Sequence, residues 1–328
     1  MRVVVATGRF DAATLPLAHR HGARTAFLGA MGLGLLAAAL FSSSFVVNKS
    51  MQLGGGAWEW TASLRYLMLL PLLAAIVGAR RGLRPVLAAL RAEPVRWLAW
   101  STIGFGLFYA PLAFAVSAGP GWLLAGTWQL TVLAGILLAP LLYDDERAVI
   151  PRRAVAGALV VLAGVALMQV EHARGVGAEA LLVGVLPVAV AAFAYPAGNR
   201  KTMELAGGRL DTRQRILAMV IASLPFWLVL SAVGAVRAGA PAAEQLGQSL
   251  LVAVISGLLA TALFFAATAR VRRHPARLAA VEATQSGEVV FAAGLEAVVL
   301  GAGLPAPLAW AGIALIVAGI GSTVLRER

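Results

Sequence analysis

The chain has 328 residues, of which 60% are hydrophobic and 13% are charged, and it contains no cysteine. An average soluble domain is about 25% charged, so too few ionised groups remain here to cover a water-facing surface. The composition argues against a soluble globular or disordered protein, and the lack of cysteine excludes disulfides and thiolate metal sites.

Long apolar segments follow one another along the chain. A membrane-spanning helix needs about 20 apolar residues, and the segments lack the alternation of barrel strands. The sequence therefore predicts an all-α polytopic membrane protein with ten transmembrane helices. The predicted spans are residues 25–47, 58–79, 96–117, 120–143, 150–170, 179–199, 213–236, 248–270, 277–300 and 304–325.

Lysine and arginine are unequally distributed between alternate loops. Of 27 such residues, 23 lie on one side of the predicted spans, three lie on the other side, and Arg65 lies inside a span. The rich side, to which Arg200 and Arg215 are assigned, is cytoplasmic by the positive-inside rule. We expect both termini in the cytoplasm, with residues 1–24 forming a tail that lacks the apolar core of a signal peptide. The net charge of +12 then needs no nucleic-acid partner.

An internal repeat relates the two halves of the chain. The order Asn, basic, Ser or Thr, Met, Gln or Glu, Leu begins at Asn48 and again at Asn199, about 150 residues later. Two further matches occur in the same order, one between Thr127-Trp128-Gln129 and Ala283-Thr284-Gln285, the other between the glycine pairs Gly157/Gly164 and Gly312/Gly319. Three matches in one order indicate a true repeat rather than chance similarity.

The repeat predicts the domain organisation. The first half would span residues 25–170 and the second residues 171–328, each with five helices. Because five is odd, the second half enters the membrane in the opposite sense, and such inverted repeats are a recurrent plan of secondary transporters. The paired glycines allow close helix packing, either within the chain or in a homodimer.

This plan resembles the drug/metabolite transporter superfamily over residues 25–325. The resemblance is carried by Ser63-Leu64-Arg65-Tyr66, by Gly121 to Gln129 in the fourth span, and by Glu296, which precedes the last glycine-rich helix. The sequence is most similar to the EamA-like pattern and to the ten-helix multidrug-resistance efflux transporter family. The resemblance implies efflux of a small molecule. Glu282 and Glu288 depart from it, because the ninth helix is usually more apolar in the superfamily.

Ionisable residues in the hydrocarbon core cost about 2.5–3.5 kcal/mol on insertion scales, so they point to function. Glu288 lies about 16 Å into its span, near the middle of a ~30 Å core. We predict that Glu288 couples protons to substrate binding, against the alternative of a structural carboxylate. Gln129 and its repeat counterpart Gln285 are expected at the same level. Flat or cationic substrates would meet aromatic side chains at this depth, namely Trp128, Tyr109 and Tyr195.

The remaining charged residues within the predicted spans are expected mainly to have gating or structural roles. Arg65, about 10 Å from the outer end of its span, is expected to form a gating or structural ion pair or to bind an anionic group. Glu282, close to the cytoplasmic boundary, is the second gating candidate. Glu296 is expected to be structural, and Glu59 to be solvated at the outer boundary.

The most probable function is therefore a secondary active transporter in the bacterial inner membrane. It would export a small organic compound, cationic or neutral and amphipathic, by proton antiport with alternating access. An exporter or exchanger of metabolites or amino acids without proton coupling is the alternative, and a channel or an intramembrane enzyme acting on lipid precursors is more remote. The partners would be substrate, protons and the lipid bilayer, without a cofactor or a metal ion.

Overall fold

The structure is a computed structural model that describes residues 17–118, 121–150, 152–173, 178–299 and 307–325. Throughout these residues the chain forms helices and turns without a strand. Six helical stretches within them are long and apolar enough to cross a membrane, namely Thr25–Leu53, Trp58–Gly78, Pro94–Ser117, Leu182–Ala206, Thr212–Ala238 and Ala243–Val271. Shorter apolar helices occur at Gly126–Leu137, Ala154–Leu167 and Pro307–Gly319.

The first half of the chain contains helices up to α9. They are α1 (Leu17–Leu53), α2 (Trp58–Gly78), α3 (Leu83–Ala92), α4 (Pro94–Ser101), η2 (Thr102–Gly106), α5 (Leu107–Ala118), α6 (Gly121–Trp128), α7 (Leu130–Leu137), α8 (Ala139–Leu142), η3 (Glu146–Ala148) and α9 (Arg152–Ala173). α4, η2 and α5 form one continuous stretch, in which η2 is a wider π-helical turn.

The second half follows a similar order. Its helices are α10 (Ala178–Ala206), α11 (Thr212–Ala238), α12 (Ala243–Val252), η4 (Ala253–Ala260), α13 (Thr261–Val271), α14 (Pro275–Ala283), η5 (Thr284–Ser286), α15 (Gly287–Val299) and α16 (Pro307–Leu325). A π-helical segment, η4, again lies inside the third long helical stretch of the half. Among the described residues, six of these stretches are both long and apolar enough to cross a membrane.

Two predicted spans are interrupted rather than continuous. The segment 120–143 breaks at Gln129, between α6 and α7, and the segment 277–300 tightens into the 3₁₀ turn η5. The Thr284 hydroxyl donates to the carbonyl of Val281 at 2.6 Å, which is one bond that competes with regular α-helix. Both interruptions fall on the Thr-Trp-Gln and Ala-Thr-Gln matches of the repeat.

Helix boundaries differ elsewhere too. α1 begins at Leu17, eight residues before the predicted span, so part of the expected tail of residues 1–24 is helical, and residues 1–16 lie outside the described structure. α3 was not predicted, because it is too short and too polar on one face to span a membrane.

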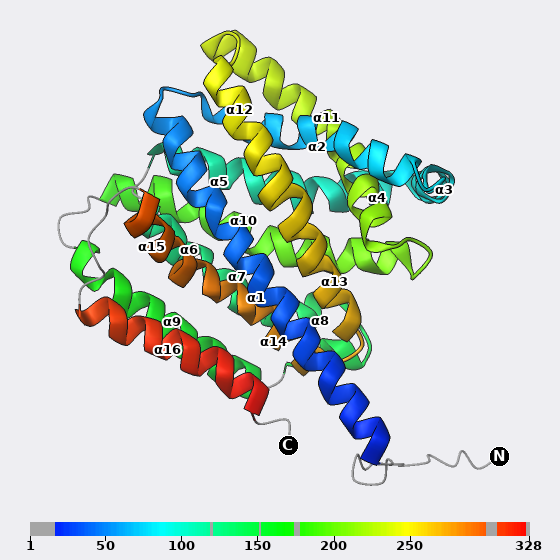
Figure 1. Ribbon diagram of the computed structural model, residues 1–328, viewed down its shortest axis with the longest axis vertical. Helices are drawn as coiled ribbons and strands as arrows, with labels where there is room; N and C mark the ends of the chain where they lie inside the picture. The colour runs from blue at the N-terminus through cyan, green and yellow to red at the C-terminus, as the bar shows by residue number, and fades with distance from the viewer. Residues whose placement is uncertain (1–16, 119–120, 151, 174–177, 300–306, 326–328) are drawn as a thin grey trace.

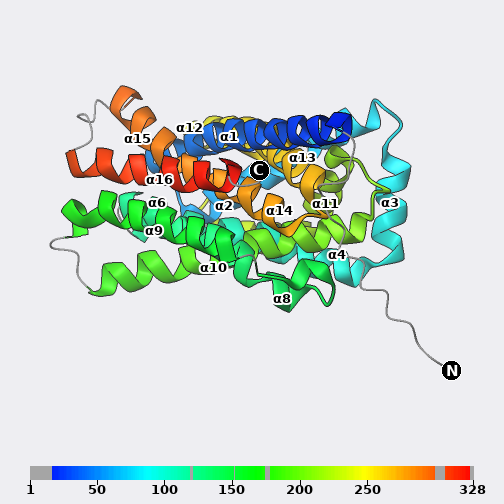
Figure 2. The ribbon, with the colours of Figure 1, turned by 90° about the horizontal axis from the view of Figure 1, so that it is seen from below.

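The last helices of the two halves, α9 and α16, lie side by side in both ribbon views (Figures 1 and 2). A Cβ atom added to Gly319 would lie 3.1 Å from the carbonyl oxygen of Gly157, and one added to Gly164 would meet the carbonyl of Gly312. The glycines thus let two backbones approach closely, as in other small-residue contacts between membrane helices. The paired glycines pack against each other within one chain.

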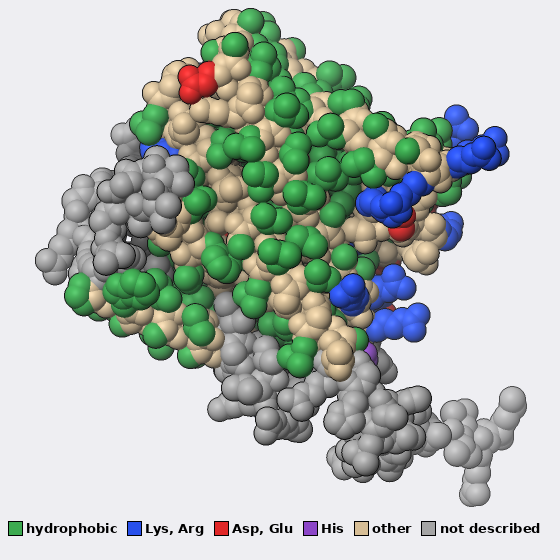
Figure 3. Space-filling model, in the orientation of Figure 1, with side chains coloured by type: hydrophobic (Ala, Val, Ile, Leu, Met, Phe, Trp, Pro, Cys, Tyr) green, Lys and Arg blue, Asp and Glu red, His purple; other side chains and the backbone are tan. Residues whose placement is uncertain are grey.

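Helices from different halves also pack elsewhere in the bundle. α1 contacts α13 and α15, while α10 contacts α5 and α7, and α2 packs against α11. The outward surface is apolar, with residues such as Leu186, Leu228 and Val229 more than half exposed. Lys and Arg gather at one end of the helices, at right in Figure 3, and we call this the basic end. It includes α3, which carries Arg84, and the turns after α10 and α13, which carry Arg209, Arg272 and Arg273.

The contact between α9 and α16 makes a testable prediction. Gly164→Leu places a side chain against the Gly312 backbone, where overpacking costs about 1–3 kcal/mol or more. We expect a clearly lower thermal unfolding temperature for purified protein in detergent. The matched control is Gly247→Leu in α12, where an added Cβ meets nothing within 4 Å. Equal stability of the two variants would contradict the packing.

Candidate functional site

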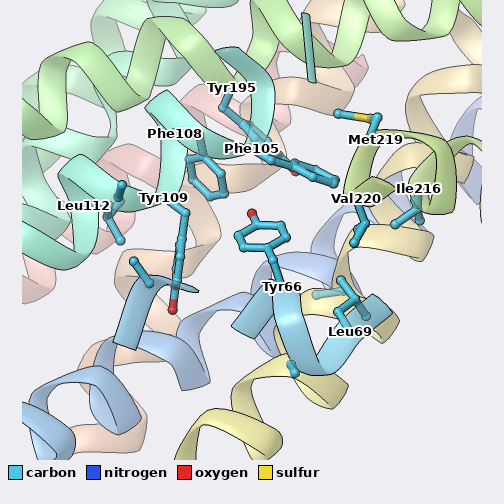
Figure 4. Packing of buried hydrophobic residues seen from close by; sticks show 14 of the residues in the cluster. Tyr66, Leu69, Phe105, Phe108, Tyr109, Leu112, Tyr195, Ile216, Met219 and Val220 are labelled. Carbon is cyan, nitrogen blue, oxygen red and sulfur yellow. The ribbon is translucent and has the colours of Figure 1, made fainter. Parts of the chain in front are cut away.

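A cluster of buried aromatic rings occupies the centre of the bundle. Phe108 of α5 packs against Trp128 of α6 and Tyr195 of α10, with ring centroids 5.3 and 4.6 Å away, respectively. Figure 4 shows Phe108 and Tyr195 within this cluster. Tyr195 also stacks on Phe264 of α13 at 5.7 Å and meets Phe41 of α1 edge-on at 6.5 Å. Rings from four other helices, α1, α5, α6 and α13, therefore surround Tyr195 of α10.

A narrow cavity lies beside this cluster. Its volume is about 20 Å³, which is room for about one water molecule. The cavity is thus too small for an organic compound in this conformation. Its lining consists of Phe41, Ser44, Phe45, Arg65, Phe108, Tyr109, Leu112, Trp128, Tyr195, Ser256, Gln285 and Glu288.

Glu288, in the first turn of α15, presents a carboxylate to this cavity. Its side chain is buried, and its Oε1 has no hydrogen-bond partner among the described residues. The Trp128 side chain is close enough to interact with the carboxylate, yet its Nε1 lacks hydrogen-bond geometry to any described acceptor. A buried, incompletely bonded carboxylate is costly and is typical of a group that binds a proton or a cation.

Arg65, on α2, is the opposite charge in the cavity. Its guanidinium carbon lies 4.1 Å from the centroid of the Tyr109 ring, a cation–π contact, and the Tyr109 hydroxyl donates to Asn48 Oδ1 at 3.1 Å. Arg65 has no ion pair within 4.0 Å among the described residues. Its charge is therefore compensated by aromatic rings and by the more distant Glu288.

The two glutamines of the repeat occupy the helix interruptions. Gln129 separates α6 from α7 and is completely buried, although it is not among the cavity-lining residues. Gln285, in η5, lines the cavity, and its Nε2 lacks a hydrogen-bond partner in the described structure. Of the eight residues selected from the sequence, six line one cavity, Gln129 lies at the interruption beside it, and Glu282 lies elsewhere.

Glu282 belongs to a separate buried ion pair. Its two carboxylate oxygens accept hydrogen bonds from Arg200 of α10, from Nε at 3.0 Å and from a terminal nitrogen at 2.6 Å. Both side chains are buried, and Gly135 of α7 leaves the space that the carboxylate fills. Glu282 and Glu288 lie on either side of the 3₁₀ turn η5, and Glu282 is not among the residues that line the cavity of Glu288.

An open pocket of about 620 Å³ adjoins this ion pair at the basic end. Its lining includes Tyr143, Arg147, Arg200, Arg272 and Arg273. The Tyr143 ring lies 4.0 Å from the guanidinium carbon of Arg147, and burial raises the pKa of Tyr143 to about 12. The phenol is therefore neutral at physiological pH, and Arg200, which lines this pocket, also forms the buried pair with Glu282.

A third pair lies towards the opposite end. Glu59, in the first turn of α2, accepts a hydrogen bond from Arg237, in the last turn of α11, at 2.8 Å. The expectation that Glu59 is solvated is wrong, since its side chain is only 3% exposed. Gly234 makes this approach possible, because a Cβ there would lie 3.0 Å from Glu59 Cβ.

Two buried arginines were missed by the sequence analysis. Both were assigned to the cytoplasmic side. Arg200 is instead buried in α10, which extends past the predicted span 179–199, and Arg215 is buried in the first turns of α11, within the predicted span 213–236. Arg215 lies 4.2 Å from the Phe265 ring, and its terminal nitrogens have no hydrogen-bond partner among the described residues. The repeat could have found them, because Lys49 and Arg65 occupy corresponding positions about 150 residues earlier.

Glu296 and a metal site are the two remaining features that the sequence raised. The helix α15 includes Glu296, but its side chain lies outside the described part of the structure. Within the described residues, no group of three or more His, Asp or Glu side chains is placed to hold a metal ion.

The Arg200–Glu282 pair makes a stability prediction. Glu282→Leu leaves Arg200 buried without a partner, which typically costs about 3–5 kcal/mol. We expect a large loss of thermal stability in detergent, substantially recovered in the double variant Arg200→Met/Glu282→Leu.

The control is the more exposed pair between Lys201 and Glu204, whose atoms are 3.0 Å apart. Glu204→Leu is expected to cost less than about 1 kcal/mol. Equal losses for Glu282→Leu and Glu204→Leu, or no recovery in the double variant, would contradict the assignment.

The comparisons with known proteins agree with this architecture. A family model described as "Putative multidrug resistance efflux transporter" matches residues 28–328. A Bacillus subtilis (strain 168) protein named "Uncharacterized protein YjlA" is 49% identical over 300 residues, which cover 89% of this chain and 93% of the relative. A Shouchella clausii protein, named "Uncharacterized 42.1 kDa protein in intracellular alkaline protease 3'region", is 46% identical over 271 residues, covering 81% of this chain and 71% of its own.

A solved crystal structure has the same fold, with a TM-score of 0.68 at 18% identity, and the match covers 89% of this chain and 95% of that chain. Because the family match covers most of the chain, the assignment does not depend on this structural likeness. The chain belongs to the multidrug resistance efflux transporter family of the drug/metabolite transporter superfamily.

Proposed function

We propose that this protein is a secondary active transporter that exports a small organic compound in exchange for protons. The observation that carries the proposal is the buried Glu288 carboxylate, which faces a closed, ring-lined cavity and has an oxygen without a partner among the described residues. The family supports membrane efflux in general. The proposal adds two statements to this general role: the substrate is a cationic or neutral amphipathic compound, and its export is coupled to protons.

Competition for one carboxylate provides the coupling. When Glu288 is ionised, it attracts a positive group on the substrate, and aromatic neighbours such as Trp128 and Tyr195 add favourable contacts. When Glu288 binds a proton, that attraction is lost and the substrate leaves. The single carboxyl group of Glu288 is then occupied alternately by one proton or by the substrate, which is the simplest form of antiport.

Alternating access is supported by the ion pairs above and below the cavity. Glu59–Arg237 joins α2 to α11 towards one end, and Arg200–Glu282 joins α10 to α14 towards the basic end. With both pairs formed, the cavity between them holds about one water molecule. We propose that either pair opens in turn and that this conformation is the closed intermediate, so Glu282 acts as a gate.

The proposed architecture is ten spans in two inverted repeats, residues 25–170 and 171–328, after a tail of residues 1–24. Paired features support it, because α1 packs against α13 and α15, while α10 packs against α5 and α7. The wide turns η2 and η4 and the interruptions at Gln129 and η5 also occur in matching order. The short helices α9 and α16 would complete the ten spans.

The proposed location is the bacterial inner membrane, with the basic end and both termini in the cytoplasm. The apolar outward surface suits a lipid bilayer, and the arginine-rich end follows the positive-inside rule. The proposal includes no homodimer, because the glycine faces that suggested one cover each other within the chain.

The orientation is tested with single cysteines, for which the cysteine-free chain provides no background. Leu53→Cys and Ala240→Cys, both at exposed sites away from the basic end, are expected to react with an impermeant thiol reagent added outside cells. Arg84→Cys and Arg209→Cys should react only after the membrane is opened. Labelling of all four from one side would contradict the inverted arrangement.

The coupling is tested by transport of ethidium, a permanent cation, into proteoliposomes with an imposed pH gradient. Glu288→Gln resembles the protonated carboxyl group, which in this proposal releases the substrate, and should reduce gradient-driven ethidium accumulation at least tenfold. Glu204→Gln, at an exposed site, should transport normally. Full gradient-driven accumulation by Glu288→Gln would contradict proton coupling through this residue, and wild-type flux that ignores the gradient would favour an exchanger.

A further inference from the structure

The open pocket at the basic end has more positive than negative charge in its lining. Two acidic residues, Asp145 and Glu204, are outnumbered there by four arginines, namely Arg147, Arg200, Arg272 and Arg273. We propose that this pocket is a binding site for a phosphate monoester, held by Arg272 and Arg273. The pocket shares no lining residue with the cavity of Glu288, and the inference does not depend on the transport mechanism proposed above.

Two of the four arginines already have carboxylate partners. Arg147 donates two hydrogen bonds to Asp145, from Nε at 2.9 Å and from a terminal nitrogen at 2.6 Å. These bonds lower the pKa of Asp145 to about 2, so the pair stays ionised at physiological pH. Arg200 is paired with Glu282, and the second acid of the lining, Glu204, accepts a hydrogen bond from a lysine at 3.0 Å. Neither acid of the lining is therefore left to neutralise the other two arginines.

Arg272 and Arg273 are the uncompensated charges of the pocket. They form the turn between α13 and α14, where the His274 amide donates to the Val271 carbonyl at 2.9 Å. Neither arginine has a carboxylate within 4.0 Å among the residues that the structure describes. Arg272 also lies close enough to the buried Arg215 to be repelled by its charge. Two adjacent unpaired guanidinium groups beside a third cation favour the binding of an anion.

The end of α10 contributes a wall of the pocket that carries no side chain. Gly207, which lines the pocket, has a φ angle of 56°, and the following Gly208 has a φ angle of 81°. Residues with a Cβ atom rarely adopt this left-handed conformation. A Cβ at Gly208 would lie 3.7 Å from a terminal nitrogen of Arg272. The glycine turn thus places bare backbone beside this guanidinium, where a side chain would compete with a ligand for space.

The charge and size of the pocket favour a phosphate monoester over a carboxylate. A phosphate monoester carries about −1.5 to −2 charge at pH 7 and has three acceptor oxygens, which suit two guanidinium forks. A carboxylate carries one negative charge and would leave one of the two arginines uncompensated. The volume of about 620 Å³ also accommodates an organic group on the phosphate, to which Tyr143 and Met203 offer apolar contact.

Two sources supply this chemical group, a soluble phosphate ester and the headgroup of phosphatidic acid. Both contain glycerol 3-phosphate in its simplest form, free in one case and carrying two acyl chains in the other. The same chemistry can therefore be presented to the full-length protein from solution and from lipid, and the two experiments tell the sources apart.

The soluble source is tested by calorimetry on the protein in phosphatidylcholine nanodiscs at pH 8. Glycerol 3-phosphate should bind at least tenfold more tightly than glycerate, which has a carboxylate instead of the phosphate. Arg272→Gln/Arg273→Gln should weaken that binding at least tenfold. The matched control is Arg80→Gln/Arg81→Gln, which removes the same charge from an exposed turn next to α3 that does not line the pocket, and its affinity should stay within twofold of wild type.

The lipid source is tested by thermal unfolding in detergent with added phosphatidic acid, compared with phosphatidylglycerol, a phosphate diester. Phosphatidic acid should raise the unfolding temperature by about 3 °C or more relative to phosphatidylglycerol, because a ligand that binds only the folded state stabilises it. This difference should persist in Arg80→Gln/Arg81→Gln and disappear in Arg272→Gln/Arg273→Gln.

A response in either experiment that depends on Arg272 and Arg273 supports the site and identifies its source. The proposal is overturned if neither glycerol 3-phosphate nor phosphatidic acid gives a response, or if the compound that does is matched by its control, glycerate or phosphatidylglycerol. It is also overturned if Arg80→Gln/Arg81→Gln loses the response as fully as Arg272→Gln/Arg273→Gln does. Because neither readout measures transport, each of these results leaves the proton coupling proposed for Glu288 to its own test.

Discussion

Burying charge among membrane-spanning helices is the constraint on which the interior of this protein depends. Lipid cannot solvate an ionised side chain, so each buried charge needs an ion pair, an aromatic ring or a ligand. Glu59 and Glu282 are satisfied by arginines on other helices, and Arg215 is stacked on a ring. Only the cavity that contains Arg65 and Glu288 brings opposite charges together without joining them within the described structure.

The interrupted helices explain how this cavity is built. A regular α-helix already places Glu282 and Glu288 about 120° apart around its axis. With the turn η5 between them, Glu282 pairs with Arg200, and Glu288 lines the cavity beside the central rings. The break at Gln129 brings a second interruption against it, since α7 contacts η5. Backbone irregularity at membrane depth is tolerated where it is enclosed by protein, as it is at these two places.

Much of the fold could be predicted from composition and apolar periodicity, because those patterns reflect the local requirement for spanning helices. The glycine pairs also predicted a close contact, and the structure shows it between Gly157 and Gly319. The ends of helices were harder to predict from the sequence. For example, α10 extends past its apolar segment and buries Arg200 against the carboxylate of Glu282, which is distant in sequence. The position of such a helix end depends on the residues that it contacts in the folded protein, and the hydropathy of a segment contains no information on those contacts.

The same limit applied to the site. Depth alone selected Glu288, the glutamines and the aromatic residues, because an ionisable or large polar group in the core is conspicuous in sequence. Depth could not show that Arg65 stacks on Tyr109 instead of forming an ion pair. The measurement that tests the account most directly is proton release when ethidium binds the purified protein in weakly buffered solution. The account predicts release of up to about one proton per bound ethidium, increasing as the pH is lowered, and none in Glu288→Gln; binding without release at every pH, or equal release by Glu288→Gln, would contradict it.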